Sequence, residues 1–186
     1  MIPRFLRRAR ERRRTIGTLH QRIGEAARRR DLYETLDVPD TVEGRFEALS
    51  LHVILVLRRL GQLPPPADEV AQELIDSVFV QLDESLRELG VGDMGVSKRI
   101  KKLGASFYAR AGAYGTALDA GDTQALAAAL ARNVLANEME TKEAGAAQGL
   151  AAYVRASADT LGTQDLDALL NQGPLFAPPI PAPQEA

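Results

Sequence analysis

The chain has 186 residues, a net charge of −2, two histidines, no cysteine and no tryptophan. That length allows one domain with a hydrophobic core, and the lack of cysteine excludes disulfides, iron–sulfur clusters and thiolate-bound zinc. With His20 and His52 as the only histidines, the sequence predicts no metal site and no cofactor.

The apolar stretches of the sequence are short. The longest one without charge, residues 48–57, is about half of the ~20 residues that a membrane-spanning helix requires. No apolar secretory signal follows the first arginines. We therefore expect a soluble or peripheral protein that stays on the side of the membrane where it is made, with a eukaryotic presequence as the alternative.

Positive charge is concentrated in an arginine arm, residues 1–30, with eleven arginines and two glutamates, a net +9. Residues 31–186 carry twelve basic and twenty-three acidic side chains, a net −11. Because Ile16, Leu19 and Ile23 recur at helical spacing, the arm is predicted to be partly helical, with residues 1–14 unfolded on their own. The arm binds an anionic membrane, or it binds RNA phosphates, or it is a solvated extension. Specific binding to DNA is not expected. The residues assigned to the contact are Arg4, Phe5, Leu6, Arg7, Arg8, Arg12, Arg13 and Arg14.

A helix-start signal at residues 38–46 leads directly into the apolar stretch 49–57. Asp40 is predicted to accept hydrogen bonds from the first turn, and Glu43, three residues later, to complete a capping box. The residues that follow are nearly all apolar, so this helix is expected to be enclosed by its neighbours. The sequence thus predicts a bundle built around a buried central helix.

Three polar side chains, Arg45, His52 and Arg59, recur every seven residues along this central helix and form one stripe. The stripe either binds an acidic segment of a client or partner, or it pairs inside the chain with Asp76 or Asp83. Partly buried arginines normally keep a carboxylate partner, which favours the second interpretation. His52 is not expected to bind a metal or haem, because no second ligand lies one turn away.

Helical periodicity continues along the rest of the chain, and no segment has the alternation of a β-strand. We expect an all-α, single-domain bundle of about five to seven helices. The three predicted parts are a basic arm (1–30), a helical domain (31–170) and a proline-rich, disordered tail (171–186). The predicted segments are a proline linker at 64–66, a helix at 67–89, a glycine reversal at 90–95, a helix at 96–118, alanine-rich helices around Leu126–Val134 and Leu150–Leu161, and a short helix at 166–170.

The helix at 96–118 begins with a basic cluster, Lys98, Arg99, Lys101 and Lys102. This cluster is either a solvated face or a contact for lipid head groups, ribosomal RNA or an acidic client loop. Asp93, just before it, either caps the helix or supports the loop. Four aromatic side chains are interpreted as lining either the core or a groove: Tyr33, Phe46, Phe107 and Tyr108.

Two blocks of the sequence resemble the ubiquinol-cytochrome c chaperones, which help to assemble the cytochrome bc complex. The first block comprises Tyr33, residues 38–46, Leu51-His52 and residues 57–60. The second comprises Asp83, residues 86–93, Gly95-Val96, Lys98-Arg99 and Phe107-Tyr108. Together they cover roughly residues 30–135, and the alanine-rich stretch after Gly121 looks like a bacterial version of the family.

The resemblance implies a non-enzymatic assembly factor that binds newly made cytochrome b at the inner membrane, near the ribosome and with a small partner protein. This agrees with the absence from the sequence of a phosphate-binding loop or a recognisable catalytic motif. The alternative function is a helical adaptor whose arm binds RNA, the ribosome or a membrane surface. The residues assigned to client or partner binding are Tyr33, Arg45, Phe46, His52, Arg59, Asp93, Lys98, Arg99, Lys102 and Tyr108.

Overall fold

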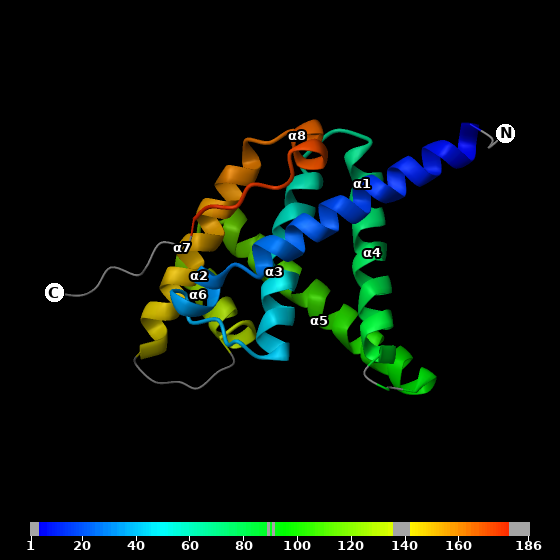
Figure 1. Ribbon diagram of the computed structural model, residues 1–186. Helices are drawn as coiled ribbons and strands as arrows, with labels where there is room; N and C mark the ends of the chain where they lie inside the picture. Colours follow the sequence, from blue (N-terminus) through cyan, green and yellow to red (C-terminus); the bar gives the residue numbers. More distant parts are fainter. Residues whose placement is uncertain (1–3, 89, 91, 136–141, 179–186) are drawn as a thin grey trace.

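The computed structural model describes residues 4–88, 90, 92–135 and 142–178, with the backbone alone for residues 4–10 and 142–144. This part of the chain forms eight α-helices and no β-strand, which confirms the all-α, single-domain prediction (Figure 1). Two of the helices, α2 and α8, are short, with five and six residues. The helices are α1 (Arg4–Ala27), α2 (Arg30–Glu34), α3 (Val42–Leu60), α4 (Ala67–Glu88), α5 (Asp93–Asp119), α6 (Thr123–Asn133), α7 (Lys142–Gly162) and α8 (Leu166–Asn171).

Helix α3 is the centre of the bundle. It packs against α1, α4, α5 and α7, and α1 crosses it in Figure 1. Val53, Val56 and Leu60 on α3 are fully buried. Residues 50–56 are all buried, so the apolar run that predicted an enclosed helix is covered on every side and belongs to the core of the fold.

The start of α3 differs from the predicted capping box. Thr41 is the N-cap, and its hydroxyl accepts a hydrogen bond from the Gly44 amide at 3.0 Å. Asp40 instead accepts a hydrogen bond from Nε of Arg45 at 2.6 Å. Gly44 lies so close to Pro39 that an added Cβ would overlap the Pro39 carbonyl oxygen. The entry to α3 therefore depends on a hydroxyl cap and on the absence of a side chain at Gly44.

The arginine arm belongs to the folded domain from α1 onwards. Helix α1 begins at Arg4, so residues 4–14 are helical in the whole protein, and the prediction that residues 1–14 are unfolded on their own stays a prediction; residues 1–3 lie outside the described part. Ile16, Leu19 and Ile23 are buried, and α1 packs against α3, α4 and α8. Further along α1, Arg22 donates a hydrogen bond to the Asn171 carbonyl at the end of α8.

Helices α4 and α5 form a hairpin whose turn lies at the lower right of Figure 1, away from α7. The prolines before Ala67 and the left-handed Gly90 (φ 78°) mark the two ends of α4, as predicted. Phe79 and Phe107 meet edge to face with 6.2 Å between ring centroids and hold the two helices together. Helix α5 starts at Asp93, three residues before the predicted start.

The C-terminal segment, residues 173–178, is extended but packed, so the prediction of a disordered tail does not hold for it. The Gln164 side-chain amide donates to the Gly173 carbonyl (2.9 Å), and its oxygen accepts from the Leu175 amide (2.8 Å). The Ala177 amide donates to the Ser157 hydroxyl on α7 (3.2 Å). These polar side chains replace the hydrogen bonds that a helix or strand would provide. Residues 179–186 lie outside the described part.

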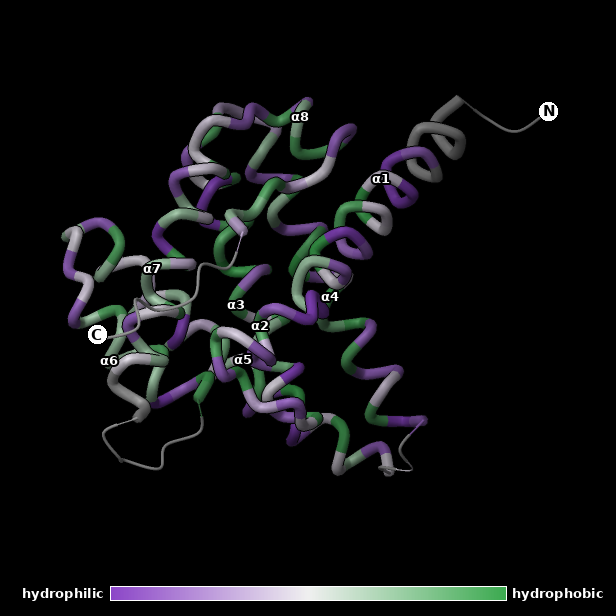
Figure 2. Tube along the Cα trace, turned by 60° about the vertical axis from the view of Figure 1, so that its left-hand side comes forward, coloured by the Kyte–Doolittle hydropathy of each residue, from purple (hydrophilic) through white to green (hydrophobic). Residues whose placement is uncertain are grey.

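Apolar and polar residues alternate along most helices of the bundle (Figure 2). This pattern is typical of helices with one buried face and one face in water. Among the described residues, no helix combines the length and the apolar character needed to cross a bilayer.

Candidate functional site: a groove between α1 and α4

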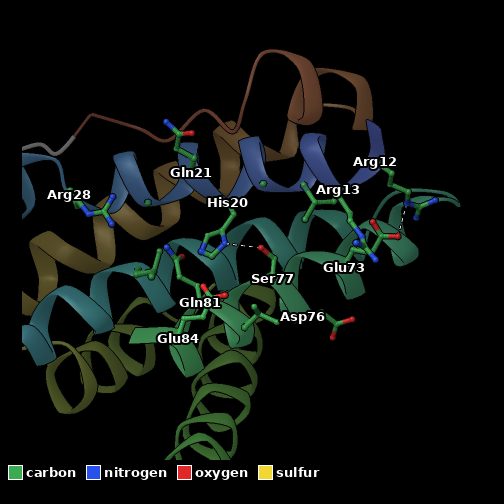
Figure 3. A pocket seen from close by; sticks show the side chains of 15 residues that line it. Arg12, Arg13, His20, Gln21, Arg28, Glu73, Asp76, Ser77, Gln81 and Glu84 are labelled. Atoms are coloured by element: carbon green, nitrogen blue, oxygen red, sulfur yellow. Dashed lines mark hydrogen bonds and ion pairs between the residues drawn. The ribbon is translucent and has the colours of Figure 1, made fainter. Parts of the chain in front are cut away.

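A groove of about 1050 Å³ runs between α1 and α4 (Figure 3), and Leu49 of α3, which packs against the core, contributes to its lining. Volumes of this size are typical of ligand-binding clefts. Its apolar lining comes from Ile16, Leu49 and Val80, and Val80 is 58% exposed. The groove is thus beside the central helix, and part of its lining packs against the core.

A hydrogen bond between His20 on α1 and Ser77 on α4 joins the two walls of the groove. His20 Nδ1 and the Ser77 hydroxyl are 3.0 Å apart, and His20 is 7% exposed (Figure 3). Burial, and secondarily the positive charge of Arg28, lower the pKa of His20, so the imidazole is favoured in its neutral form. Sequence reasoning missed this pair, although His20 lies at helical spacing between Ile16 and Ile23.

The two walls carry opposite charges. Arg12, Arg13 and Arg28 come from α1, and Glu73, Asp76 and Glu84 come from α4. One end of the groove is closed by Arg12, which forms ion pairs with Glu69 (2.8 Å) and Glu73 (2.6 Å). These carboxylates raise the pKa of Arg12 through hydrogen bonds. Arg12 is therefore engaged in ion pairs within the protein, and the membrane or RNA contact predicted for it stays a prediction.

The predicted stripe of Arg45, His52 and Arg59 does not form one surface. Arg45 is at the exposed start of α3 and pairs with Asp40, which holds the pKa of that carboxyl below its usual range. Arg59 donates from Nε to the Gln164 carbonyl at 2.8 Å. The partners are thus different from Asp76 and Asp83, because α7 and the residues after it cover the far end of α3.

His52 is fully buried between α7 and the C-terminal segment. Its Nδ1 lies 2.7 Å from the Ala48 carbonyl, which can only accept, so Nδ1 carries the proton. Nε2 then accepts from the Tyr153 hydroxyl at 2.7 Å. Burial lowers the pKa of His52 to about 4. The ring of Phe176 packs edge-on against the imidazole, with 4.6 Å between centroids. His52 is therefore a neutral core residue with both nitrogens engaged.

The remaining aromatic candidates lie in different places. Tyr33 is half-buried on α2, donates to the Ala27 carbonyl at 2.7 Å, and has its pKa raised by burial. Phe46 is half-buried near the start of α3. Tyr108 is 58% exposed on α5, with its ring against the edge of Phe107. The structure brings Tyr33 close to Arg45, whose charge acts on its hydroxyl, but it does not bring Tyr108 to them.

The basic start of α5 is exposed. Lys98, Arg99, Lys101 and Lys102 are all on the surface, and a shallow pocket of about 480 Å³ beside them is lined by Met94, which is 89% exposed. Asp93 is not the cap, because Gly92 occupies the N-cap position without a side-chain bond. Asp93 instead accepts a hydrogen bond from Arg87, which also pairs with Asp83.

The arginine arm can be followed only in part. Arg13 and Arg14 are exposed on α1. The side chains of Arg4, Phe5, Leu6, Arg7 and Arg8 lie outside the described part. The membrane or RNA contact predicted for them stays a prediction.

The described residues contain no group of three or more histidine, cysteine or acidic side chains that could hold a metal ion. The His20–Ser77 pair has the elements of a base and a nucleophile, but no carboxylate among the described residues hydrogen-bonds to His20. The features that remain are surfaces for binding: the α1–α4 groove and the basic end of the α4–α5 hairpin.

Comparison with known proteins identifies the family. A family model described as ubiquinol-cytochrome C chaperone matches residues 34–176, which extends beyond the region of about 30–135 that carried the resemblance. Ubiquinol-cytochrome-c reductase complex assembly factor 1 of Xenopus laevis is 25% identical over 150 residues, covering 81% of this chain and 74% of the relative. The crystal structure of the Cbp3 homolog from Brucella abortus is 42% identical, with a TM-score of 0.80 over 96% of this chain and 97% of that one. The chain belongs to the ubiquinol-cytochrome C chaperone family.

Proposed function

We propose that this chain is an assembly chaperone that binds newly made cytochrome b and releases it into ubiquinol–cytochrome c reductase. Membership of the chaperone family and the name of the Xenopus laevis relative support this role. The observation that carries the proposal is the open α1–α4 groove, because a chaperone without enzymatic activity needs a surface that holds its client. Apolar side chains that line the groove would shield apolar parts of cytochrome b from water.

The α4–α5 hairpin provides a second contact surface in this proposal. Met94 is 89% exposed and Tyr108 is 58% exposed, and large apolar side chains with this exposure are favourable anchors for a partner. The neighbouring Lys98, Arg99 and Lys102 would attract acidic loops of the client. Asp93 and Arg87 would set the start of α5 from which these side chains extend.

The arginine arm would hold the chaperone at the membrane where cytochrome b is inserted. Each arginine near an anionic leaflet contributes on the order of 1 kcal/mol before screening. We place the protein at the cytoplasmic face of the inner membrane, or at the matrix face in a mitochondrion. Binding to anionic vesicles and to RNA, each titrated with salt with and without residues 1–14, would distinguish a lipid contact from an RNA contact.

The direct test is deletion of the gene in a respiring host. We expect lower amounts of the cytochrome bc complex and slower quinol oxidation, with both restored by the wild-type gene. Cytochrome b synthesis should continue, because the chaperone acts after translation. Normal levels of the mature complex together with normal quinol oxidation would refute the assembly role.

A further inference from the structure

We propose that the α1–α4 groove binds one amphipathic helix of a partner protein, with carboxylates along the edge facing α1 and basic side chains along the edge facing α4. This inference rests on the proposed function, because it describes the kind of segment that the chaperone holds. It is carried by the shape of the α1 wall and by the distribution of charge across the groove.

Two positions of the α1 wall have no side chain of their own: Gly17, which is exposed, and Gly24, which is buried beneath the guanidinium of Arg28. The two glycines line the groove seven residues apart, which puts them two turns apart on the same side of α1. A Cβ added at Gly17 would meet nothing within 4 Å, and one at Gly24 would meet only the guanidinium of Arg28, with Nη1 at 3.3 Å. Packing inside the chain therefore does not require either glycine, although glycine disfavours a helix by about 1 kcal/mol relative to alanine.

The length of the groove fits a helix. Its lining on α1 extends from Arg12 to Arg28, and at 1.5 Å per residue this corresponds to about 24 Å, or roughly four helical turns. The wall is bare backbone at Gly17, and at Gly24 only the exposed, flexible side chain of Arg28 covers it, so a second helix could approach α1 closely at positions two turns apart once Arg28 turns outward to pair with it.

The charges decide what the edges of that helix carry. On the α1 wall, Arg13 and Arg28 are exposed, and neither has an ion pair among the described residues. On the α4 wall, Asp76 and Glu84 are exposed. A segment of one sign along both edges would be repelled by one wall, and a wholly apolar segment would remove charges from water without pairing them. A helix with one acidic edge and one basic edge would place a charge of opposite sign against each wall.

A hydrogen-bonding group that lines the groove adds to this match. His20 lies between the two glycines along α1, and Nδ1 is taken by Ser77. Nε2 has no hydrogen-bond partner among the described residues. A polar side chain in the apolar ridge of the partner helix would supply that partner.

The test uses three synthetic helical peptides of about 18 residues with the same leucine ridge. One has glutamates along one edge and lysines along the other, the second has glutamates on both edges, and the third has lysines on both. Fluorescence anisotropy with the full chain should show the first peptide binding at least about ten-fold more tightly than the other two. Equal affinity for all three peptides would overturn the proposal.

Two glycine variants test the position of the site. Gly17→Leu fills the gap in the α1 wall and should lower the affinity for the first peptide by about ten-fold or more. Gly112→Leu on α5 is the matched control, since a Cβ there also meets nothing within 4 Å and the residue does not line the groove; it should not change binding. Thermal unfolding of both variants verifies that they are folded, and loss of binding in neither or in both would also contradict the proposal.

Charge reversal separates this inference from the proposed function. The double variant Arg13→Glu, Arg28→Glu makes both walls acidic and should prefer the peptide with two lysine edges. If this switch occurs while deletion of the gene leaves the cytochrome bc complex normal, the docking site stands and the assembly role fails. If deletion lowers the complex while the peptides bind alike, the assembly role stands and the helix-binding groove fails.

Discussion

The hydroxyl of Tyr153 donates a hydrogen bond to Nε2 of His52 over 2.7 Å in the interior of the bundle. Because burial lowers the pKa of His52 to about 4, the unfolded chain, with a pKa near 6.5, binds a proton more readily than the folded one. The contribution of His52 to stability is therefore present above pH 6.5 and is lost as the pH falls through 4.

His52→Gln isolates this effect. When the pH is lowered from 7 to 5, the free energy of unfolding should fall by about 2 kcal/mol more for the wild-type protein than for the variant, as measured by chemical denaturation. Tyr153→Phe is the companion variant, because it removes the hydroxyl that donates to His52 and leaves the imidazole of His52 in place. A difference in unfolding free energy between wild type and His52→Gln that is independent of pH would contradict the assignment.

Glu47 has the opposite dependence on pH. Its carboxylate pairs with Arg110 at 2.6 Å, but burial raises the pKa of Glu47 to about 7 from 4.5. The stability from this raised pKa is present below pH 4.5 and is lost as the pH rises through 7. When the pH is raised from 5 to 8, the free energy of unfolding of the wild-type protein should fall by about 2 kcal/mol relative to that of Glu47→Gln. Urea titrations at the two pH values measure this change, and a shift in favour of wild type would disprove it.

Gly44→Ala tests the entry to α3. An added Cβ would overlap the Pro39 carbonyl oxygen and lie 2.9 Å from its carbon, and backbone cannot move aside as a flexible side chain can. We expect a loss of at least about 2 kcal/mol in the free energy of unfolding. Gly112→Ala, in open space on α5, should instead stabilise the protein by about 0.5–1 kcal/mol. Equal effects of the two variants would exclude the proposed contact.

Phe176→Ala tests whether the C-terminal segment belongs to the fold. Its ring is partly buried against the core and covers His52, so we expect a loss of about 2 kcal/mol, less than the 3–5 typical of a fully buried phenylalanine. Amide exchange at Leu175 and Ala177 should also become faster. Leu175→Ala is the control because Leu175 is 52% exposed, and it should change stability by less than about 0.5 kcal/mol. An unchanged exchange rate in Phe176→Ala would mean that the segment is held by other contacts.

A photoreactive residue at Tyr108 tests the hairpin surface. In cells that are making cytochrome b, the probe should crosslink to the newly made protein, because Tyr108 is 58% exposed beside the basic start of α5. A probe at Val42, which is 76% exposed at the start of α3, serves as the control and should crosslink much less. Equal yields at the two positions would argue against a specific contact at the hairpin.

Local features of the fold were predictable from local sequence. Apolar periodicity identified α3, α4 and α5, because each of these helices buries one set of residues at helical spacing. The predicted cap, Asp40, was wrong, because the adjacent Thr41 can also accept a hydrogen bond and local sequence does not decide between the two. The structure uses Thr41 because Arg45 engages Asp40.

Features that join distant parts of the chain were not predictable. His52 obtains its partner from a residue 101 positions later, so no local pattern could reveal that the middle of the stripe is buried. The proline-rich segment lacked the periodicity of an ordered element, yet Gln164 and Ser157 hold it in place.

The α1–α4 groove depends on how two helices lie against each other, 57 residues apart at His20 and Ser77. The sequence of α1 alone only weakly indicates this groove. Gly17 and Gly24 lie in a helix that otherwise favours arginine and apolar residues, and they mark the wall of the groove.

Gln164 joins the C-terminal segment to the end of α7, and Ser157 fastens it along that helix. The Ala177 amide is therefore held against α7, which does not line the α1–α4 groove. A fluorescent reporter attached at Pro178 would follow this segment along α7, whereas one attached at Arg13 would lie on the arginine-lined wall of the groove.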